Sequence, residues 1–362
     1  MSDTWLCRCG PPGSEHCRGV ALIELLVATA IALAVLALVA TTLPPVLDVV
    51  GSVPEATDLE QRARTTEVIL EGLVRNAGAG ADLLGGGPLP LAVPGLLPRR
   101  VLASADPAGT AWADRLSMLR VDARAAQAPV ASFVPPGSVT LPLAWHPACG
   151  THVSCGFRRG DLLLVYARSG AMAITSVTDV TGLVLTLATP PDQAIDLPAV
   201  AAVVRVHTVS LDLGRRQLRL ADAAATAQPL TDEVVGFRAR YYGTPAAPRW
   251  PAIVGAETCA VAADGTPRLP LLGPVPGPPV ELTLGELADG PWCGAGKWRF
   301  DADLMRIRAV RLGIRLQAGA AGVRGVAPEW FARPGQARRP GQEVRDVELD
   351  AFITAPNLSW AQ

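Results

Sequence analysis

Two histidines and two cysteines alternate at three-residue steps in the segment 146–155. His146, Cys149, His152 and Cys155 all carry side chains that can bind zinc. Structural zinc sites, however, usually take two ligand pairs that are separated by a dozen or more residues, so that the chain can wrap around the metal. The alternative chemistry is a disulfide between Cys149 and Cys155, which persists in an oxidising compartment. The choice between the two therefore depends on where this segment resides.

An apolar run near the beginning of the chain predicts that location. Glu24 is the only charged residue from Val20 to Leu43. As an α-helix this run would reach about 36 Å, whereas the hydrocarbon core of a bilayer is about 30 Å thick. An ordinary secretory signal has an apolar region of only about 7–15 residues. The run therefore predicts a transmembrane helix.

Glu24 places one carboxylate inside this apolar run. A charged side chain at bilayer depth costs on the order of 2.5–3.5 kcal/mol, so it usually has a function. If the chain were cut after Gly19, Val20 would gain an α-amino group with a pKa of about 7.7–8.0. That amine would lie at nearly the same depth as Glu24 of a neighbouring helix, and the two charges could neutralise each other. A plain single-pass anchor whose Glu24 faces some partner is the alternative.

The sequence Gly-Val-Ala-Leu-Ile-Glu at positions 19–24, followed by the apolar run, resembles the processing site of type IV pilins and pseudopilins. In that family a prepilin peptidase cuts after a glycine, and a glutamate is the fifth residue of the mature chain. The resemblance implies cleavage between Gly19 and Val20 and a registration role for Glu24. The first mature residue of the family is usually Phe or Met, so the N-methylation of Val20 stays open.

Four further segments are similar to minor pilins of the PilW/PulJ (GspJ-like) type, namely 70–78, 160–165, 237–242 and 307–316. This resemblance implies a minor pilin or pseudopilin in the initiating or tip complex of a type IV pilus or a type II secretion pseudopilus. The implied partners are the prepilin peptidase and other minor and major pilins or pseudopilins. The alternatives are a pilin-anchored surface adhesin or binding module and a membrane-anchored periplasmic metal enzyme.

The charges around the apolar run predict its orientation. Arg8 and Arg18 precede the run, whereas acidic residues dominate the segment after it, up to Arg62. The positive-inside rule therefore places the N-terminus in the cytoplasm and the rest of the chain in the periplasm, anchored in the inner membrane before it enters a filament. The formal net charge is −1 and the arginines are dispersed, so no nucleic-acid partner is expected.

The elements that must position these groups begin with a second helical stretch. Pro44 and Pro45 each remove a helix donor, so we expect a kink or a local opening of the helix there. The sequence Thr-Asp-Leu-Glu at 57–60 is a capping box from which the helix should restart. Gly78 and Gly80 can end it. An apolar stripe that should pack under the sheet of the head domain consists of Leu59, Ala63, Thr66, Leu70, Leu73 and Ala77.

Alternating apolar residues predict strands over most of the remaining chain. The predicted strands are 116–121, 162–166, 172–177, 183–187, 200–213, 217–220, 234–242, 310–316 and 347–353. Arginines alternate in 310–316 and carboxylates in 347–353, so we predict that these two strands are antiparallel neighbours with cross-strand ion pairs. A change of phase at His207 and Thr208 predicts a bulge.

The predicted fold class is α+β: a pilin-like fold with a long N-terminal helix followed by an elaborate antiparallel β-sheet head domain. Its parts are a cytoplasmic leader (1–19), a transmembrane segment (20–43), an amphipathic half of the helix (44–80) and a periplasmic β-rich head (81–362). Proline-rich segments at 85–98, 245–251, 267–279 and 328–341 are predicted to be irregular surface loops.

The seven cysteines of the chain divide between the leader and the exported part. Cys7, Cys9 and Cys17 would be discarded with the leader. The exported part keeps an even number, which predicts disulfides rather than a zinc site in an oxidising compartment. Three connectivities are possible, and nearness in the sequence favours Cys149 with Cys155 and Cys259 with Cys293.

No catalytic motif occurs in the sequence: we find no Gly-x-Ser-x-Gly elbow, no His-Glu-x-x-His pair and no phosphate-binding glycine loop. We therefore predict that the protein is not an enzyme and has no cofactor or metal. Because some pseudopilins bind calcium, Asp301 and Asp303 form a candidate pair of ligands. No third carboxylate follows them at a suitable spacing, so we interpret this segment as a solvated turn.

Overall fold

The computed structural model describes residues 22–80, 89, 92–102, 104–167, 169–222, 226–245, 278–290, 292–319, 344 and 346–358, without the side chains of 43–52 and 148. The chain divides into two units, Met1–Pro54 and Glu55–Gln362, which we describe separately. Among the predicted functional residues, Gly19, Val20 and Cys259 lie outside the described residues.

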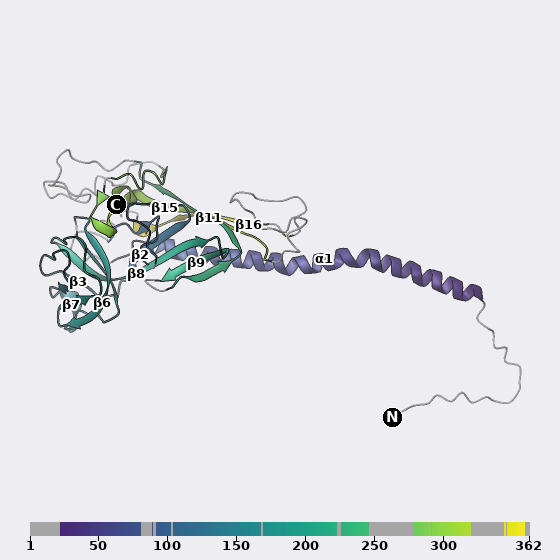
Figure 1. Cartoon of the computed structure of the whole chain (residues 1–362), viewed down its shortest axis with the longest axis horizontal. Helices are drawn as coiled ribbons and strands as arrows, with labels where there is room; N and C mark the ends of the chain where they lie inside the picture. Colours follow the sequence, from purple (N-terminus) through teal and green to yellow (C-terminus); the bar gives the residue numbers. More distant parts are fainter. Residues whose placement is uncertain are drawn as a thin grey trace, which may run out of the picture. The chain divides into compact units, whose positions relative to one another are not determined.

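The helix α1 spans Leu22–Arg75 and appears as one coiled ribbon in Figure 1. It continues through Pro44 and Pro45, so a local opening at these prolines and the predicted restart at Thr57 are both wrong. The kink, which was the alternative to an opening, stays a prediction. A proline has a φ angle close to the helical value, although it removes its own N–H donor and its ring crowds the carbonyl four residues earlier. The residues on both sides keep their helical geometry, so the missing donors do not end the helix.

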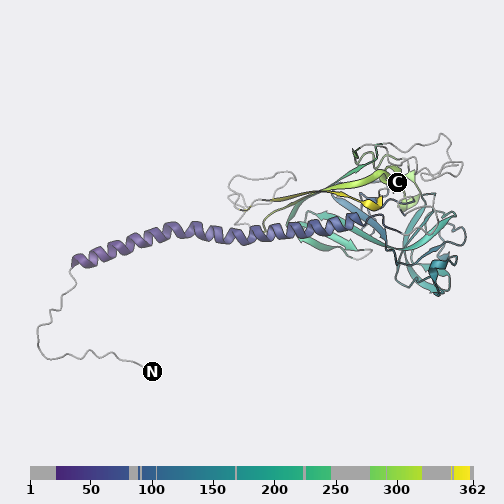
Figure 2. The ribbon, with the colours of Figure 1, turned by 180° about the vertical axis from the view of Figure 1, so that it is seen from behind.

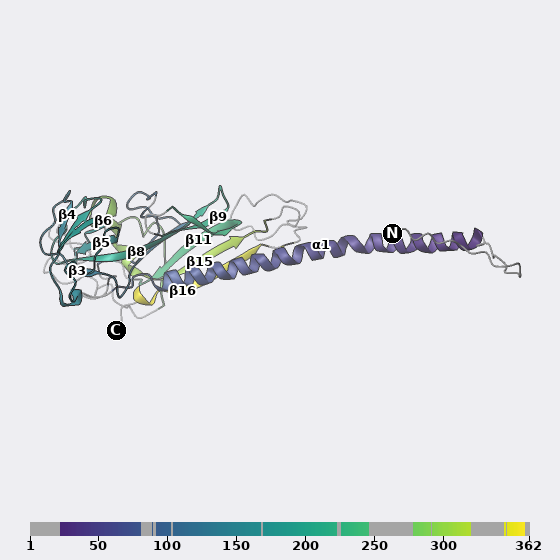
Figure 3. The same ribbon diagram turned by 90° about the horizontal axis from the view of Figure 1, so that it is seen from below.

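The part of α1 that belongs to the second unit presents the predicted apolar stripe to the β domain. Leu59, Ala63, Thr66, Leu70 and Ala77 are buried, and Leu73 is half-buried against the same core. Figures 2 and 3 show this stretch of α1 beside β16 and β15. Gly78 follows the helix with a φ of +74°, a left-handed conformation that suits the predicted end of the helix.

A four-stranded antiparallel sheet covers this stripe. Its strand order is β12 (Val280–Leu282), β11 (Val234–Gly243), β15 (Ile307–Leu316) and β16 (Val347–Thr354). β15 and β16 are antiparallel neighbours, as the alternating charges predicted. Arg311 pairs with Asp350 through contacts of 2.6 and 2.5 Å, and Arg315 lies 3.7 Å from Glu348.

A ten-stranded antiparallel sheet forms most of the remaining structure. Its main path is β1 (Leu96–Leu97), β2 (Arg115–Val121), β8 (Ala199–Asp212), β5 (Leu162–Ala167), β6 (Met172–Thr181), β7 (Val184–Leu187) and β4 (Thr140–Pro142). Beside this path, β3 (Gln127–Pro129) and β9 (Gln217–Asp222) pair with β8, and β10 (Gln228–Asp232) pairs with β9. A separate two-stranded sheet joins β13 (Trp292–Cys293) to β14 (Phe300–Asp301).

The long strand β8 separates two hydrophobic cores. Val200 and Ala202 belong to the core that contains the helix stripe and the four-stranded sheet. Ala199 and Ala201, on the opposite face of the strand, belong to a second core with the side chains of β4, β5 and β7. Both faces of this half of β8 are therefore buried, which explains its nearly continuous apolar sequence.

The bulge predicted in β8 is absent. His207 pairs with Met118 and Thr208 with Ser117, in a register that is unbroken along the whole of β2. The hydroxyl groups of Ser117 and Thr208 are buried and lie 2.7 Å apart, so a hydrogen bond explains why a polar residue occupies this position. The polar–apolar phase changes here because both faces of the strand are covered, and the pairing itself is regular.

All nine predicted strands are confirmed, and their ends agree with the prediction to within four residues. The short strands β1, β3, β4, β10, β12, β13 and β14 were not predicted. The described part of 85–98 also differs from the surface loop that we expected, because Leu89, Val93, Leu96 and Leu97 are buried in the main core. Gly95 permits this packing, since a Cβ there would lie 2.6 Å from the backbone nitrogen of Gly78. The fold class is thus α+β, as predicted.

Candidate functional site

The first candidate site is the apolar stretch of α1 from Leu22 to Thr42. It comprises 21 residues with a mean hydropathy of 2.7, and all of its side chains are exposed. This stretch is long enough and apolar enough to cross a membrane. Apolar side chains exposed on every side of a helix are stable only in lipid or against other apolar chains.

Glu24 lies in the first turn of α1. The backbone N–H groups of the first turn have no partners within the helix, and the helix dipole gives this end a partial positive charge. The helix dipole therefore stabilises the charged carboxylate of Glu24 at this position. This effect is separate from the registration role that the sequence resemblance implies. Glu24 can meet a cation that approaches the beginning of the helix, such as an amine or a basic side chain. Val20, which would supply that amine after cleavage, and Gly19 are outside the described residues.

The cysteines of the 146–155 segment are joined to each other. Cys149 and Cys155 form a disulfide, as nearness in the sequence predicted. Their sulfur atoms cannot then act as two zinc thiolates, so the four-ligand zinc site of the sequence hypothesis is not formed in this structure. Cys293 is also disulfide-bonded and is fully buried, whereas its predicted partner Cys259 lies outside the described residues.

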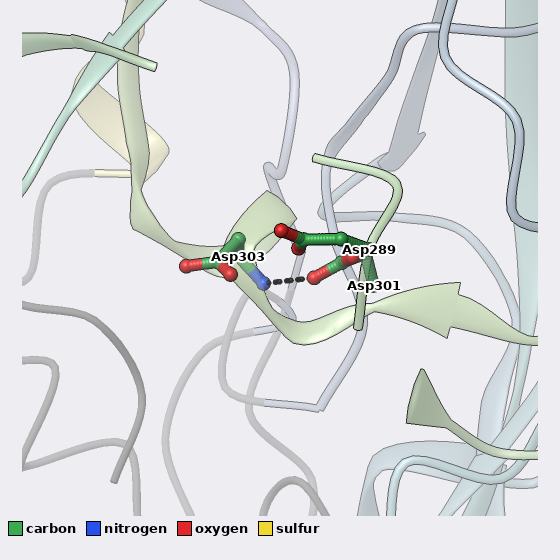
Figure 4. Close-up of side chains that lie close together, drawn as sticks. All are labelled: Asp289, Asp301 and Asp303. Carbon is green, nitrogen blue, oxygen red and sulfur yellow. Dashed lines mark hydrogen bonds between the residues drawn. The ribbon is translucent and has the colours of Figure 1, made fainter. Parts of the chain in front are cut away.

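The acidic residues near β14 form a second candidate site, shown in Figure 4. The carboxylates of Asp289, Asp301 and Asp303 approach one another within 4.8 Å. Asp301 and Asp303 are buried, so the expected solvated turn is wrong. The third carboxylate comes from Asp289, which lies twelve residues before Asp301, whereas from the sequence we looked for it after Asp303. The pairing of β13 with β14 brings Asp289 close to Asp301 and Asp303. The spacing of Asp301 and Asp303 in the sequence does not reveal this pairing.

The local hydrogen bonds explain why these carboxylates are buried. Asp301 accepts from the backbone N–H of Asp303 at 2.9 Å and from that of Gly290 at 2.5 Å. Asp303 accepts from the guanidinium of Arg306 at 2.5 Å. Burial raises the pKa of Asp301 to about 6, although the two backbone hydrogen bonds oppose the shift. Burial also raises the pKa of Asp303 against the opposing effect of Arg306.

The chemistry of this acidic cluster is mainly structural. Three carboxylates can hold a divalent cation such as calcium. Here, however, the two buried members already accept hydrogen bonds from the loop that they fix and from Arg306, and only Asp289 is exposed. The arrangement ties β13, β14 and the following turn together.

Comparisons with models of protein families, with curated proteins and with solved structures find no match for this chain. The features of the chain itself are therefore the basis for a functional proposal. Of the two candidate sites, only the apolar stretch with Glu24 exposes apolar side chains that the described part of the chain does not cover.

Proposed function

We propose that this protein is a minor pilin or pseudopilin, processed by a prepilin peptidase after Gly19 and assembled into the initiating or tip complex of a type IV pilus or a type II secretion pseudopilus. The observation that carries the proposal is the exposed apolar stretch Leu22–Thr42 with one carboxylate in its first turn. The resemblance of residues 19–24 to a prepilin processing site supplies the mechanism by which that carboxylate would meet the α-amino group of a neighbouring subunit.

The apolar stretch has two successive environments under this proposal. Before assembly it spans the inner membrane, with the N-terminus in the cytoplasm and the β domain in the periplasm. During assembly the helix leaves the lipid, and its exposed side chains must be covered by the equivalent helices of other subunits. Helices that are apolar on every side can pack in this way without any change in their own structure.

Glu24 would determine where one helix stops along another. A carboxylate in an apolar helix bundle is costly unless an opposite charge lies next to it. The α-amino group at Val20 lies four residues earlier, which corresponds to about one turn of helix. A subunit that enters at the correct depth can place its own amine or carboxylate against the opposite charge of its neighbour. An incorrect depth would leave both charges unpaired.

The folded β domain is consistent with a subunit that contributes protein contacts rather than catalysis. Its buried polar groups mainly fix loops and strands, such as the Asp303–Arg306 pair. Its size above that of a typical major pilin favours a tip-proximal position, because a bulky domain packs poorly along a repeating fibre. This step is an analogy with the family that the sequence resembles.

The test is Glu24→Ala in the native host, with Glu60→Ala as the matched control on the exposed face of the same helix. The Glu24 variant should be processed and inserted normally and should be lost from purified filaments, whereas the Glu60 variant should assemble like the wild type. Gly19→Leu should block processing, which a gel detects as the absence of the size shift. Normal incorporation of the Glu24 variant, or native protein that still begins at Met1, would contradict the proposal.

A further inference from the structure

The four-stranded sheet has a second face, which α1 does not cover. Residues alternate between the two faces of each strand. Leu312, Ile314 and Leu349 lie on the face that packs against α1, next to Leu70 of that helix. The opposite face carries Arg238 and Arg240 of β11, Arg311, Gly313 and Arg315 of β15, and Glu348 and Asp350 of β16. We call this opposite side the arginine face.

Not all arginines on this face have an acidic partner. Arg311 makes a two-contact ion pair with Asp350, and Arg315 lies 2.8 Å from Asp346. Among the residues that the structure describes, no carboxylate lies within 4.0 Å of the side-chain nitrogens of Arg238 or Arg240, and both side chains are exposed. Arg240 is also directly opposite Arg311 in the sheet. Like charges opposite each other are destabilising, and the charge of Asp350, which attracts both Arg311 and Arg240, offsets part of this cost.

A glycine forms the floor between these arginines. Gly313 pairs with Arg238 on one side and with Asp350 on the other. A Cβ added at Gly313 would meet only the carbonyl oxygen of Arg238, at 3.9 Å. The described fold therefore has room for a side chain there, and glycine weakens a strand interior. Without a side chain at this point, the face has a hollow of about 740 Å³.

We propose that the hollow of the arginine face binds an extended acidic segment of a partner protein, with carboxylates at alternate positions. Side chains two residues apart on a strand lie about 6.6–6.8 Å apart on the same face. Arg238 and Arg240 have this spacing, and so do alternate carboxylates of an extended peptide. Each guanidinium can bind one carboxylate through two parallel hydrogen bonds. The absent side chain at Gly313 leaves space for the peptide backbone.

The remaining charges favour a peptide over other anions. Glu348 and Asp350 also line the hollow. Their charges would repel a continuous polyanion such as a nucleic acid or an anionic membrane surface. In an extended peptide, by contrast, uncharged residues alternate with the carboxylates. The proposal does not depend on the function of α1, because it uses only residues of the four-stranded sheet.

The first test measures binding of a fluorescein-labelled peptide of eight residues, alternating glutamate and threonine, to the full-length protein in detergent. The control peptide alternates glutamine and threonine. The glutamate peptide should bind at least tenfold more tightly, and its affinity should fall as salt is added. Arg238→Ala with Arg240→Ala should reduce its affinity at least tenfold, to the level of the glutamine peptide. The matched control is Arg158→Ala with Arg159→Ala, which removes two neighbouring exposed arginines outside this face.

The second test changes the shape of the hollow and leaves its charge as it is. Gly313→Val adds a side chain that suits a strand, so the thermal midpoint should stay within a few degrees of the wild-type value. Binding of the glutamate peptide should nevertheless fall at least tenfold. Equal binding of the two peptides, unchanged binding by Gly313→Val, or equal losses in both double-arginine variants would each overturn the proposal. Competition by inorganic phosphate or single-stranded DNA as effective as that by unlabelled peptide would identify a general anion site instead, and would also overturn it.

Discussion

Along α1, apolar side chains from Leu22 to Thr42 are exposed on every side, whereas those from Leu59 to Ala77 follow one stripe that the β domain buries. Both stretches belong to the helix α1, but residues 22–42 contain one charged residue, whereas residues 59–77 contain six. They differ in whether the chain itself supplies the surface that covers them. The first stretch needs an environment from outside the chain, and the second has one in every molecule.

This difference separates two roles that secondary structure alone would not distinguish. Each leucine that is fully buried in the second stretch stabilises the fold by about 1.5–3 kcal/mol relative to an exposed leucine. Under the proposed function, the same side chain in the first stretch contributes nothing to the fold and instead favours partition into the membrane or into a helix bundle. Paired substitutions in the two stretches can therefore test whether the roles are truly separate.

The largest effect is expected for charges placed in the first stretch. Leu33→Lys with Leu36→Lys should oppose membrane insertion by about 6 kcal/mol, because each lysine near the centre of a spanning helix costs about 3 kcal/mol. The fraction of protein that stays with the membrane after alkaline extraction should fall sharply. The matched control, Val68→Lys with Ile69→Lys on the exposed face of the second stretch, should leave that fraction unchanged. Equal extraction of both variants would remove the distinction between the stretches.

A reverse effect is expected for the loss of apolar volume. Leu70→Ala removes a side chain that is 2% exposed, and should lower the free energy of unfolding of the β domain by about 2–5 kcal/mol. Leu33→Ala removes one that is 66% exposed, and should leave the unfolding of the β domain unchanged. Denaturant titration of the full-length protein in detergent, followed by tryptophan fluorescence, measures both. A similar loss in the two variants would show that the first stretch also packs against its own chain.

The features that could be predicted from the sequence are those that depend on neighbouring residues. The helix stripe shows in the spacing from Leu59 to Ala77, and the pairing of β15 with β16 shows in their complementary charges. The disulfide between Cys149 and Cys155 links residues six positions apart. In each case the interacting groups repeat at the period of the element or lie close together in the chain.

The features that were predicted wrongly or missed depend on contacts between distant segments. The polar residue Thr208 suggested a bulge, because its partner Ser117 is 91 residues away. Asp289 was missed as the third carboxylate because a strand pair, and no regular spacing, brings it to Asp301 and Asp303. Pro44 and Pro45 failed as a helix break for another reason, since helical residues on both sides outweigh two missing donors.

The comparison between exposed and buried side chains extends to carboxylates, where the expected effects are smaller. Asp301 is buried and its pKa is raised to about 6, mainly by that burial. Asp350 is exposed, and its pKa is lowered by the hydrogen bond from Arg311. A raised pKa means that the folded state binds the proton more tightly than the unfolded state does. Stability from Asp301 therefore increases as the pH falls from about 7 towards about 4, and it is lost as the pH rises through about 6.

Asp301→Asn should remove this dependence. The free energy of unfolding of the wild type minus that of the variant should be larger at pH 4.5 than at pH 7.5, by about 1–2 kcal/mol. The same difference for Asp350→Asn should stay nearly constant over this window, because the folded and unfolded pKa values of Asp350 both lie below it. The membrane-bound fraction of each variant should equal that of the wild type, since neither substitution touches the first stretch of α1. If both substitutions changed the free energy of unfolding with the same dependence on pH, the burial of Asp301 would not explain its raised pKa.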